Sequence, residues 1–123
     1  MQSHWVKHKN QDIFILDYTG FHMDRTKLYT EVEEAHKVII SQPENSLLTI
    51  IDVEDTVADV ETVSLLKSRS SESSKIFKKT AVVGVSGVKK VLAESIIKFS
   101  KMKNTKFFDD YGTAKDWLVE EQA

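Results

Sequence analysis

The pattern of apolar and polar positions along the chain predicts strands that alternate with helices. The segment from Leu47 to Ile51 is a continuous apolar run, closed by Asp52. A run that is apolar on both faces is typical of a strand in the middle of a sheet that is covered on both sides. A second run of this kind, from Thr80 to Ser86, follows about thirty residues later. We therefore expect the 47–51 strand at the centre of a mainly parallel sheet.

The two ends of the chain predict further strands. Residues Ser3 to Lys9 and Ile13 to Thr19 are rich in strand-forming residues on either side of Asn10-Gln11, which indicates an antiparallel hairpin. A short final strand is expected from Thr105 to Phe108. The hairpin offers an exposed edge, and both of its faces carry apolar residues, so we also consider a homodimer formed through it.

Four segments carry helix patterns. The first is capped by Asp24, ends at Pro43 and leaves its glutamates in solvent, and the last begins at Asp109 or Asp110. The second begins near Asp59 and decays after residue 66 into a serine-rich segment, 67–75. We take that segment as a fraying helix end rather than a kinase substrate. The expected inward residues are Leu28, Val32, Ala35 and Ile39, then Val60, Val63 and Leu66, then Val88, Val91, Leu92, Ser95, Ile96 and Phe99 with Ile97 outward, and finally Trp117 and Leu118.

The resulting order is β-β-α-β-α-β-α-β-α. Such alternation predicts right-handed crossovers between parallel strands, with the hairpin adding an antiparallel member. We expect one α/β domain over residues 1–123, with a four- to five-stranded sheet and about four helices.

Composition narrows the class of protein. The chain is 41% hydrophobic and 29% charged, with no cysteine, which fits a globular domain without disulfides or thiolate chemistry. No apolar run is long enough to span a bilayer, and the first residues lack the apolar core of a signal peptide, so we expect a cytoplasmic protein. We expect no nucleic-acid partner and no cofactor.

Charge is divided unevenly along the chain, although the net charge is only −2. Between residues 31 and 61 there are nine acidic residues and one lysine, and between 75 and 106 nine lysines and one glutamate. These segments form either separate solvated helix faces or a dipolar surface that steers a charged partner or pairs with a second copy.

The turn Gly84-Val85-Ser86-Gly87 is a weak candidate for anion binding. It follows a strand and begins a helix, so its free backbone N–H groups could hold an anion. Ser86, Gly87 and Lys89 would supply the contacts. The spacing of a phosphate-binding loop is absent, and a tight strand-to-helix turn accounts equally well for both glycines.

An acidic group, Asp52, Glu54 and Asp55, follows the central strand. A metal or acid–base site would need further groups from another loop, with Asp109-Asp110 as the obvious candidate. A solvated acidic loop with helix-capping duties is the simpler interpretation. No catalytic motif is present, so we expect no catalytic residue and no metal site.

Several segments together resemble the STAS domain, in particular its SpoIIAA-like branch of small bacterial proteins. These are the hairpin WVKHKNQDIFILDYTG, the strand LLTIIDV, the segment KIFKKTAVVGVSGVKK and the ending KFFDDYGTAKDWLVEE. The resemblance covers nearly the whole chain and implies the SpoIIAA-like fold.

In STAS proteins the loop and helix start after the central strand carry a phosphorylated serine, in a D-S-S-G pattern, that switches binding to an anti-sigma partner. The matching stretch here is Asp59-Val60-Glu61-Thr62, which keeps the Asp and replaces both serines. The switch is therefore not carried over. Glu61 occupies the position of the second serine, where it would act as a fixed negative charge. Thr62 is at most a shifted substitute for the serine.

Two functions follow from this resemblance. The first is a non-enzymatic protein-interaction module, with a partner that contacts Asp52, Glu54, Asp55, Asp59, Glu61 and Thr62. The second is a small-molecule or lipid-binding protein, because STAS-like folds also resemble SEC14 or CRAL-TRIO domains. That function requires an apolar pocket between sheet and helices, lined by residues such as Phe14, Leu16, Phe77 or Phe99.

Overall fold

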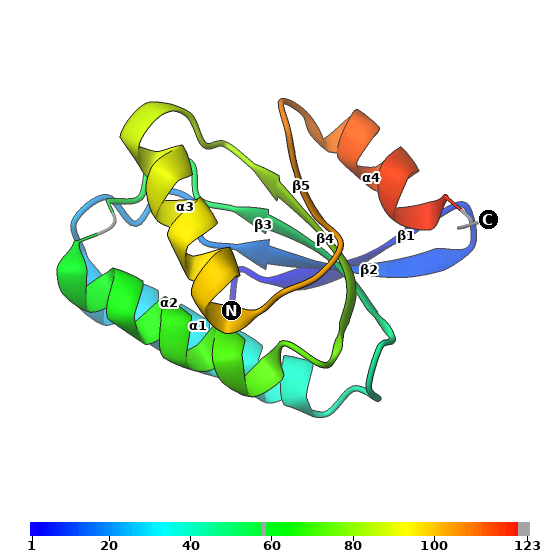
Figure 1. The fold of residues 1–123 in the computed structure, drawn as a ribbon, viewed down its shortest axis with the longest axis horizontal. Helices are drawn as coiled ribbons and strands as arrows, with labels where there is room; N and C mark the ends of the chain where they lie inside the picture. The colour runs from blue at the N-terminus through cyan, green and yellow to red at the C-terminus, as the bar shows by residue number, and fades with distance from the viewer. Residues whose placement is uncertain (58, 121–123) are drawn as a thin grey trace.

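A computed structural model describes residues 1–57 and 59–120 of the chain. It contains a mixed five-stranded sheet and helices in the order β-β-α-β-α-β-α-β-α, as expected from the sequence (Figure 1). The elements are β1 (His4–His8), β2 (Gln11–Asp17), α1 (Arg25–Ile40), β3 (Leu47–Asp52), α2 (Val60–Ser73), β4 (Phe77–Val83), α3 (Gly87–Ser100), β5 (Thr105–Phe108) and α4 (Tyr111–Val119).

The strands lie in the sheet in their order along the chain. β1 pairs antiparallel with β2, and the pairs β2–β3, β3–β4 and β4–β5 are all parallel. The prediction of β3 at the centre is confirmed, since it is the third of the five strands. The carboxyl ends of β2 and β3 align residue for residue, with Asp17 beside Asp52.

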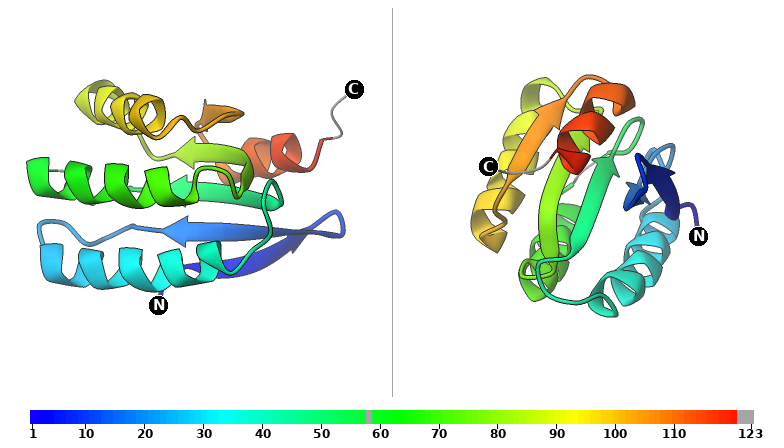
Figure 2. Two further views of the ribbon diagram at one scale, coloured as in Figure 1. Left: turned by 60° about the horizontal axis from the view of Figure 1, so that its bottom comes forward. Right: turned by 90° about the vertical axis from the view of Figure 1, so that its right-hand side faces the viewer.

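The helices form one layer on each face of the sheet. Right-handed crossovers between strands that follow one another across the sheet place α1, α2 and α3 on the same face. α4 follows the last strand and covers the opposite face (Figure 2). This division produces two separate apolar cores, one on each side of the sheet.

Local signals define most helix starts. Asp24, Asp59 and Asp110 each accept a hydrogen bond from the backbone N–H three residues later, which satisfies one of the free donors of the first helical turn. Asp24 and Asp59 were predicted as caps, and Asp110 is one of the two residues expected at the start of the last helix. The α1 stripe of Leu28, Val32, Ala35 and Ile39 is buried as expected.

The core on the α4 face is closely filled. Apart from Leu48 at 5%, its buried side chains are at most 3% exposed, and two of them, Ala114 and Leu118, come from α4. Lys79 on β4 lies under the same helix with only 2% of its surface exposed. Its Nζ donates to the carbonyl oxygens of Trp117 (2.8 Å) and Glu120 (3.0 Å), at the carboxyl end of α4.

The orientation of α3 differs from the prediction. Val88, Val91 and Phe99 were expected to be buried but are 77%, 66% and 60% exposed. The inward residues are instead Leu92, Ala93, Ile96, Ile97 and Ser100, so Ile97 faces the core rather than solvent. The helix carries apolar residues on most of its circumference, and the sequence period alone therefore does not select the face that packs.

Smaller predictions also need correction. β4 begins at Phe77 rather than Thr80, and α2 continues to Ser73, which is 2% exposed, so the serine-rich segment is helical rather than frayed. Val60 is 86% exposed and does not belong to the core. Glu31 is buried because its carboxylate accepts hydrogen bonds from the backbone N–H groups of residues 2 and 3.

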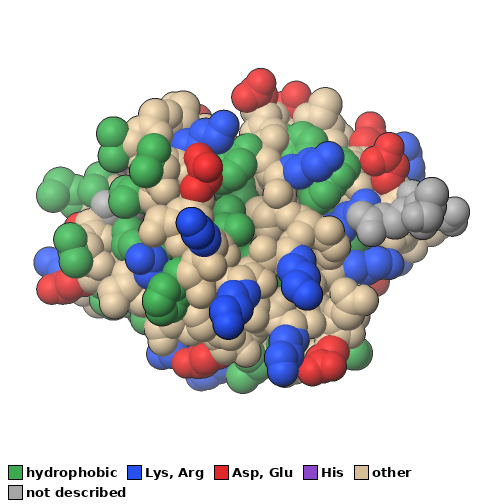
Figure 3. Space-filling view, in the orientation of Figure 1, with side chains coloured by type: hydrophobic (Ala, Val, Ile, Leu, Met, Phe, Trp, Pro, Cys, Tyr) green, Lys and Arg blue, Asp and Glu red, His purple; other side chains and the backbone are tan. Residues whose placement is uncertain are grey.

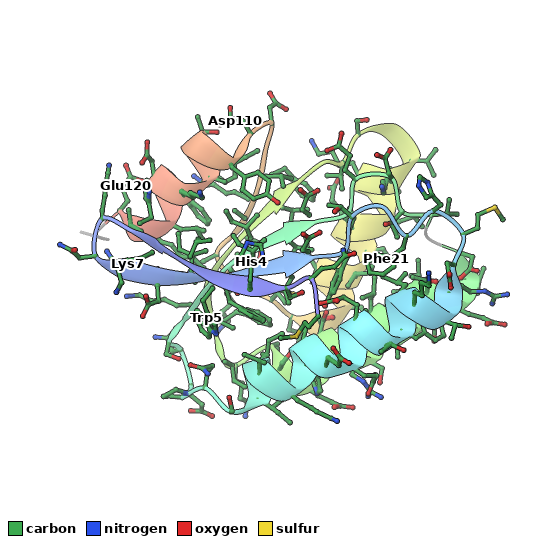
Figure 4. The ribbon with its side chains drawn as sticks, turned by 180° about the vertical axis from the view of Figure 1, so that it is seen from behind. His4, Trp5, Lys7, Phe21, Asp110 and Glu120 are labelled. Carbon is green, nitrogen blue, oxygen red and sulfur yellow. The ribbon has the colours of Figure 1, made fainter. Side chains whose placement is uncertain are left out.

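The hairpin provides an exposed edge, β1, but its apolar residues are already covered within the chain. Ile13, Phe14, Ile15 and Leu16 on β2 are at most 3% exposed. Trp5 and Lys7 lie on the free edge strand, which Figure 4 shows from behind. The argument for a homodimer from apolar residues on both hairpin faces is therefore wrong.

Candidate functional site

The loop after β3 lies at the carboxyl edge of the sheet and is held by a ladder of backbone hydrogen bonds. The N–H groups of Tyr18, Gly20 and His22 donate to the carbonyls of residues 52, 54 and 55 at 2.8–2.9 Å. The N–H of Val57 donates back to the carbonyl of His22 at 2.8 Å. Residues 53–57 are therefore a fixed continuation of the sheet edge and not a free loop.

Asp52 is an internal anchor of this edge. It is 6% exposed, and its Oδ2 accepts a hydrogen bond of 2.6 Å from the hydroxyl of Tyr111 on α4. Its Oδ1 accepts from the N–H of Glu54 at 3.1 Å. Gly84 passes so closely that a Cβ there would lie 2.8 Å from the same Oδ1, and its φ of +76° also favours glycine.

Tyr111 gains a tightly held proton from this arrangement. Burial raises the pKa of its phenol, and the hydrogen bond to Asp52 with the negative charge of that carboxylate raises it further. The sequence does not reveal this pair, because the two residues are 59 positions apart. The pair joins the start of α4 to the end of β3.

Glu54 and Asp55 form the exposed acidic part of the loop. The Nζ of Lys89, in the first turn of α3, reaches back and donates to the carbonyl oxygen of Val53. Burial lowers the pKa of Lys89, while Asp55, Asp52 and Glu54 act in the opposite direction. The acidic loop is thus connected to the start of α3 through one lysine.

This contact bears directly on the candidate anion site. Ser86 and Gly87 do lie at the start of α3, with Ser86 as the N-cap residue and Gly87 at a φ of +55°. Lys89, however, is engaged with the acidic loop, where three carboxylates lie close to its ammonium group. Lys89 is therefore not free to bind an anion, and the three nearby carboxylates would repel one.

The start of α2 carries a surface ion-pair cluster. Asp59 accepts the N–H of Thr62 at 2.8 Å, and this hydrogen bond lowers the pKa of the Asp59 carboxyl. Arg25 on α1 contacts both Asp59, at 3.3 Å, and Glu61. The negative charges of Glu61, with the larger effect, and of Asp59 raise the pKa of Arg25. Arg25 was not among the residues singled out from the sequence.

The six candidate partner-binding residues therefore fall into two groups. Asp52 and Thr62 are 6% and 2% exposed, so in this conformation a partner does not reach their side chains. Glu54, Asp55, Asp59 and Glu61 are accessible, and Asp59 and Glu61 both contact Arg25. Val57 follows Asp55 by two positions, is 51% exposed and lines a surface hollow together with Asp59. Partner binding at these residues stays a prediction, confined to the accessible group.

A second feature lies between the sheet and its three-helix face. A cavity of about 90 Å³ is bounded by β2, β3 and β4 and by α1, α2 and α3, with mostly apolar walls. A neighbouring cavity of about 60 Å³ shares the walls formed by Tyr18, Val53, Leu66, Ala93 and Ile96. Leu16 and Phe77 line the larger cavity as expected, whereas Phe14 is not among its lining residues and Phe99 lies outside on the surface.

Two buried polar groups face these cavities. Burial raises the pKa of the Tyr18 phenol, so this residue presents a neutral hydroxyl. The hydroxyl of Thr62 is buried without a hydrogen-bond partner among the described residues, and Thr62 lines the smaller cavity. His36 and Arg69 close the larger cavity on the α1–α2 side, where both contact Glu72.

Metal binding and membrane spanning leave no signature in the described residues. Within 1–57 and 59–120, no group of three or more His, Asp or Glu side chains is arranged to hold a metal ion. In the same part of the chain, each helix is too short or too polar to cross a bilayer.

The fold and site just described define a mixed α/β domain with three helices on one face of the sheet and one on the other. No protein-family model matches the chain, and no curated protein sequence matches it. Among solved structures, it is similar to an uncharacterised protein of the DUF3478 family with a SpoIIAA-like fold from Shewanella loihica. The identity is 18%, the TM-score is 0.65, and the match covers 95% of this chain and 92% of the other.

The chain therefore has a SpoIIAA-like fold, which confirms the fold implied by the STAS resemblance. At 18% identity the similarity establishes the arrangement of strands and helices and carries no activity with it.

Proposed function

We propose that this protein is a non-enzymatic interaction module that binds a protein partner in the cytoplasm. The contact surface is the accessible part of the loop after β3 together with the start of α2, and we call it the acidic edge. It comprises Glu54, Asp55, Val57, Asp59 and Glu61.

The observation that carries this proposal is an exposed apolar side chain set among carboxylates on a fixed backbone. Val57 is 51% exposed, and its backbone is hydrogen-bonded to His22 at 2.8 Å. A surface that is already ordered loses little conformational entropy when a partner binds. Exposed carboxylates around an apolar contact favour a partner that presents an apolar side chain among lysines or arginines.

The acidic edge also supports a partner contact that does not depend on phosphorylation. Thr62, the shifted substitute for the STAS serine, is buried, so a kinase does not reach it in this conformation. Glu61 supplies a carboxylate in the first turn of α2, where it is favourable and where it also contacts Arg25. We therefore expect binding by the unmodified chain.

Reversal of charge at the acidic edge tests the proposal. The variant Glu54→Lys/Glu61→Lys should bind its partner at least about tenfold more weakly, because two attractive contacts become repulsive. The matched control is Glu44→Lys/Asp109→Lys, which makes the same charge change at exposed positions outside the edge. Quantitative mass spectrometry of proteins captured from the native cytosol compares the three chains.

The expected result is a protein that is retained by the wild type and the control and lost with the edge variant. Equal capture by all three chains, or no specific capture by any of them, contradicts the proposal.

A second function, binding of a small apolar molecule, is favoured by the adjoining cavities beneath α2 and α3. Their walls are mostly apolar, with polar groups that include Tyr18, Thr62, His36 and Arg69, which fits a small and mainly apolar ligand. Native mass spectrometry of protein purified from its own cytosol should then show an added mass, which Ala93→Leu removes by occupying the space that both cavities share. A spectrum with the mass of the bare chain only would exclude this function.

A further inference from the structure

The outer face of α3 is unusually apolar for a surface helix. Val88 and Val91 are 77% and 66% exposed, and Phe99 is 60% exposed. With the exposed Ser95 they are spaced i, i+3, i+7 and i+11, which aligns them as one stripe along the helix. The opposite face of α3 already packs on the sheet through Leu92, Ala93, Ile96, Ile97 and Ser100. A helix that is apolar on both sides is normally covered on both sides.

The stripe continues onto α2 across a shallow groove. Val60 and Val63 of α2 and Leu92 of α3 line this groove, and Val60 is 86% exposed. In Figure 3, hydrophobic side chains gather where α2 and α3 begin, at the left of the view. Together the stripe and the groove form one apolar surface, which we call the α2–α3 face.

Charge on the α2–α3 face differs between its two ends. Asp59 lines the groove at the start of α2, and Lys67 lines it two turns further along, with its Nζ 5.2 Å from the ring centre of Phe99. On α3, Glu94 precedes Lys98 by one turn. On α2 the acidic group of the groove therefore lies nearer the start of the helix than the basic group, and on α3 Glu94 stands in the same order to Lys98, after Lys89 and Lys90 in the first turn.

We propose that the α2–α3 face binds a second copy of this chain in a two-fold dimer, with the two α3 helices antiparallel and crossing at Ser95. A two-fold axis at Ser95 places Val91 of each copy opposite Phe99 of the other, since these residues lie four positions on either side of it. The small serine at the crossing allows the helices to approach closely.

The charges of the face match this arrangement. A two-fold axis reverses the direction of the face, so the basic end of one copy, at Lys67, lies against the acidic end of the other, at Asp59. Glu94 and Lys98 face their counterparts in the same way. A membrane surface is the alternative occupant, because Lys67 and Lys98 would attract anionic lipid while Glu94 and Asp59 would repel it, and sedimentation with vesicles distinguishes the two. This order of charges matches itself when a second copy is turned by a two-fold axis, and an unrelated helix would not carry the matching charges.

The dimer and the function proposed for the acidic edge share one residue, Asp59, and otherwise use different ones. The apolar contacts of the dimer are Val60, Val88, Val91 and Phe99, whereas the partner contact uses Val57. The variants that test the two interactions leave Asp59 unchanged and alter different residues, so failure of one proposal is distinguishable from failure of the other.

The absence of cysteine from the chain permits a direct test by cross-linking. In the full chain, Ser95→Cys introduces a single thiol at the proposed two-fold axis. A short bifunctional thiol reagent should then yield a covalent dimer in high amount. The control is Lys78→Cys, an exposed position on β4, which should yield several-fold less. Equal yields from the two variants overturn the proposal.

Light scattering over a range of concentrations provides the second measurement. The wild type should approach twice the mass of the chain, and Val91→Asp should remain a monomer because it places charge in the apolar contact. The control Met23→Asp changes an apolar residue that is 81% exposed outside the face and should still dimerise. Circular dichroism confirms that both variants fold, since neither residue is buried.

Two results overturn the dimer. One is a monomeric wild type at the highest concentration measured. The other is a monomer that sediments with vesicles containing phosphatidylserine and loses this binding in Val91→Asp, which assigns the face to a membrane instead.

Discussion

The two faces of the sheet are covered in different ways. On one face, a short helix of nine residues, α4, is fixed at both ends by polar contacts from the sheet, Tyr111 with Asp52 and Lys79 with the last carbonyls. Its core side chains, Ala114 and Leu118, are at most 1% exposed. On the other face, α3 is longer, yet its inward apolar residues are only half-buried and cavities remain beneath it.

The difference shows which part of the molecule is built for stability and which for contact. A filled core with satisfied polar groups resists change in volume, whereas a partly filled one accepts it. The proposed dimer face and the apolar cavities lie on the three-helix side, and the acidic edge adjoins it at the start of α2. We expect substitutions to cost most on the α4 face.

The largest effect is expected from truncation of the α4 core. Leu118→Ala removes a side chain that is 1% exposed and should lower the free energy of unfolding by about 3 kcal/mol. Ile96→Ala on α3 is the matched truncation, and it should cost about 1 kcal/mol because Ile96 is half-buried beside an existing cavity. Urea unfolding of both variants measures the difference. Equal losses would show that the two faces are packed alike.

Replacement of an alanine by a larger residue should change the stability of the protein in opposite directions on the two faces. Ala114→Leu adds volume where Ala114 is fully buried on the α4 face and should destabilise the protein by about 2 kcal/mol. Ala93→Leu adds the same atoms beside both cavities and should stabilise it by about 0.5 kcal/mol. Thermal unfolding should therefore shift in opposite directions, and a clear loss for Ala93→Leu would show that the cavities do not accept a larger side chain.

The smallest of the three effects on the α4 face concerns the hydrogen bond between Tyr111 and Asp52. Tyr111→Phe should cost about 1 kcal/mol at neutral pH, because the buried carboxylate loses one donor. The folded state raises the pKa of this phenol above its ordinary value near 10. The stabilisation is therefore complete below about pH 10 and decreases at higher pH, as the unfolded phenol loses its proton while the folded one keeps it.

The alkaline part of the stability profile identifies this contribution. Loss of Tyr111 should flatten the decline above about pH 10 by up to about 1.4 kcal/mol per pH unit. A decline remains in the variant, because burial also raises the pKa of Tyr18. Identical slopes for the wild type and Tyr111→Phe would remove the pH-linked role of the pair.

Features that depend on neighbouring residues were predictable from the sequence. The apolar run at Leu47–Ile51 indicated a central strand because both of its faces are apolar, and aspartates at 24, 59 and 110 indicated helix starts because capping acts over three residues. These signals, with the alternation of elements, were sufficient for the fold.

Features that depend on distant residues were not. Lys79 is buried because carbonyl groups 38 and 41 positions away satisfy its ammonium group, and nothing near it in the sequence announces them. The orientation of α3 was misjudged because its apolar residues fit more than one inward face, and only the packing against the sheet and α2 selects between them. At the candidate site, the acidic residues were found from the sequence, whereas Arg25 and Tyr111 were not, and Lys89 was assigned to an anion site instead of the acidic loop.

The burial of Lys79 makes this residue a natural reporter of opening at the carboxyl end of the chain. An amine reacts with an acylating reagent only when it is exposed, and Lys79 is 2% exposed beneath α4. Lys78, its exposed neighbour, reacts from the folded state and serves as an internal standard in the same peptide. The rate at which Lys79 becomes labelled therefore measures how often α4 leaves the sheet, which is local unfolding followed at one atom without any mutation.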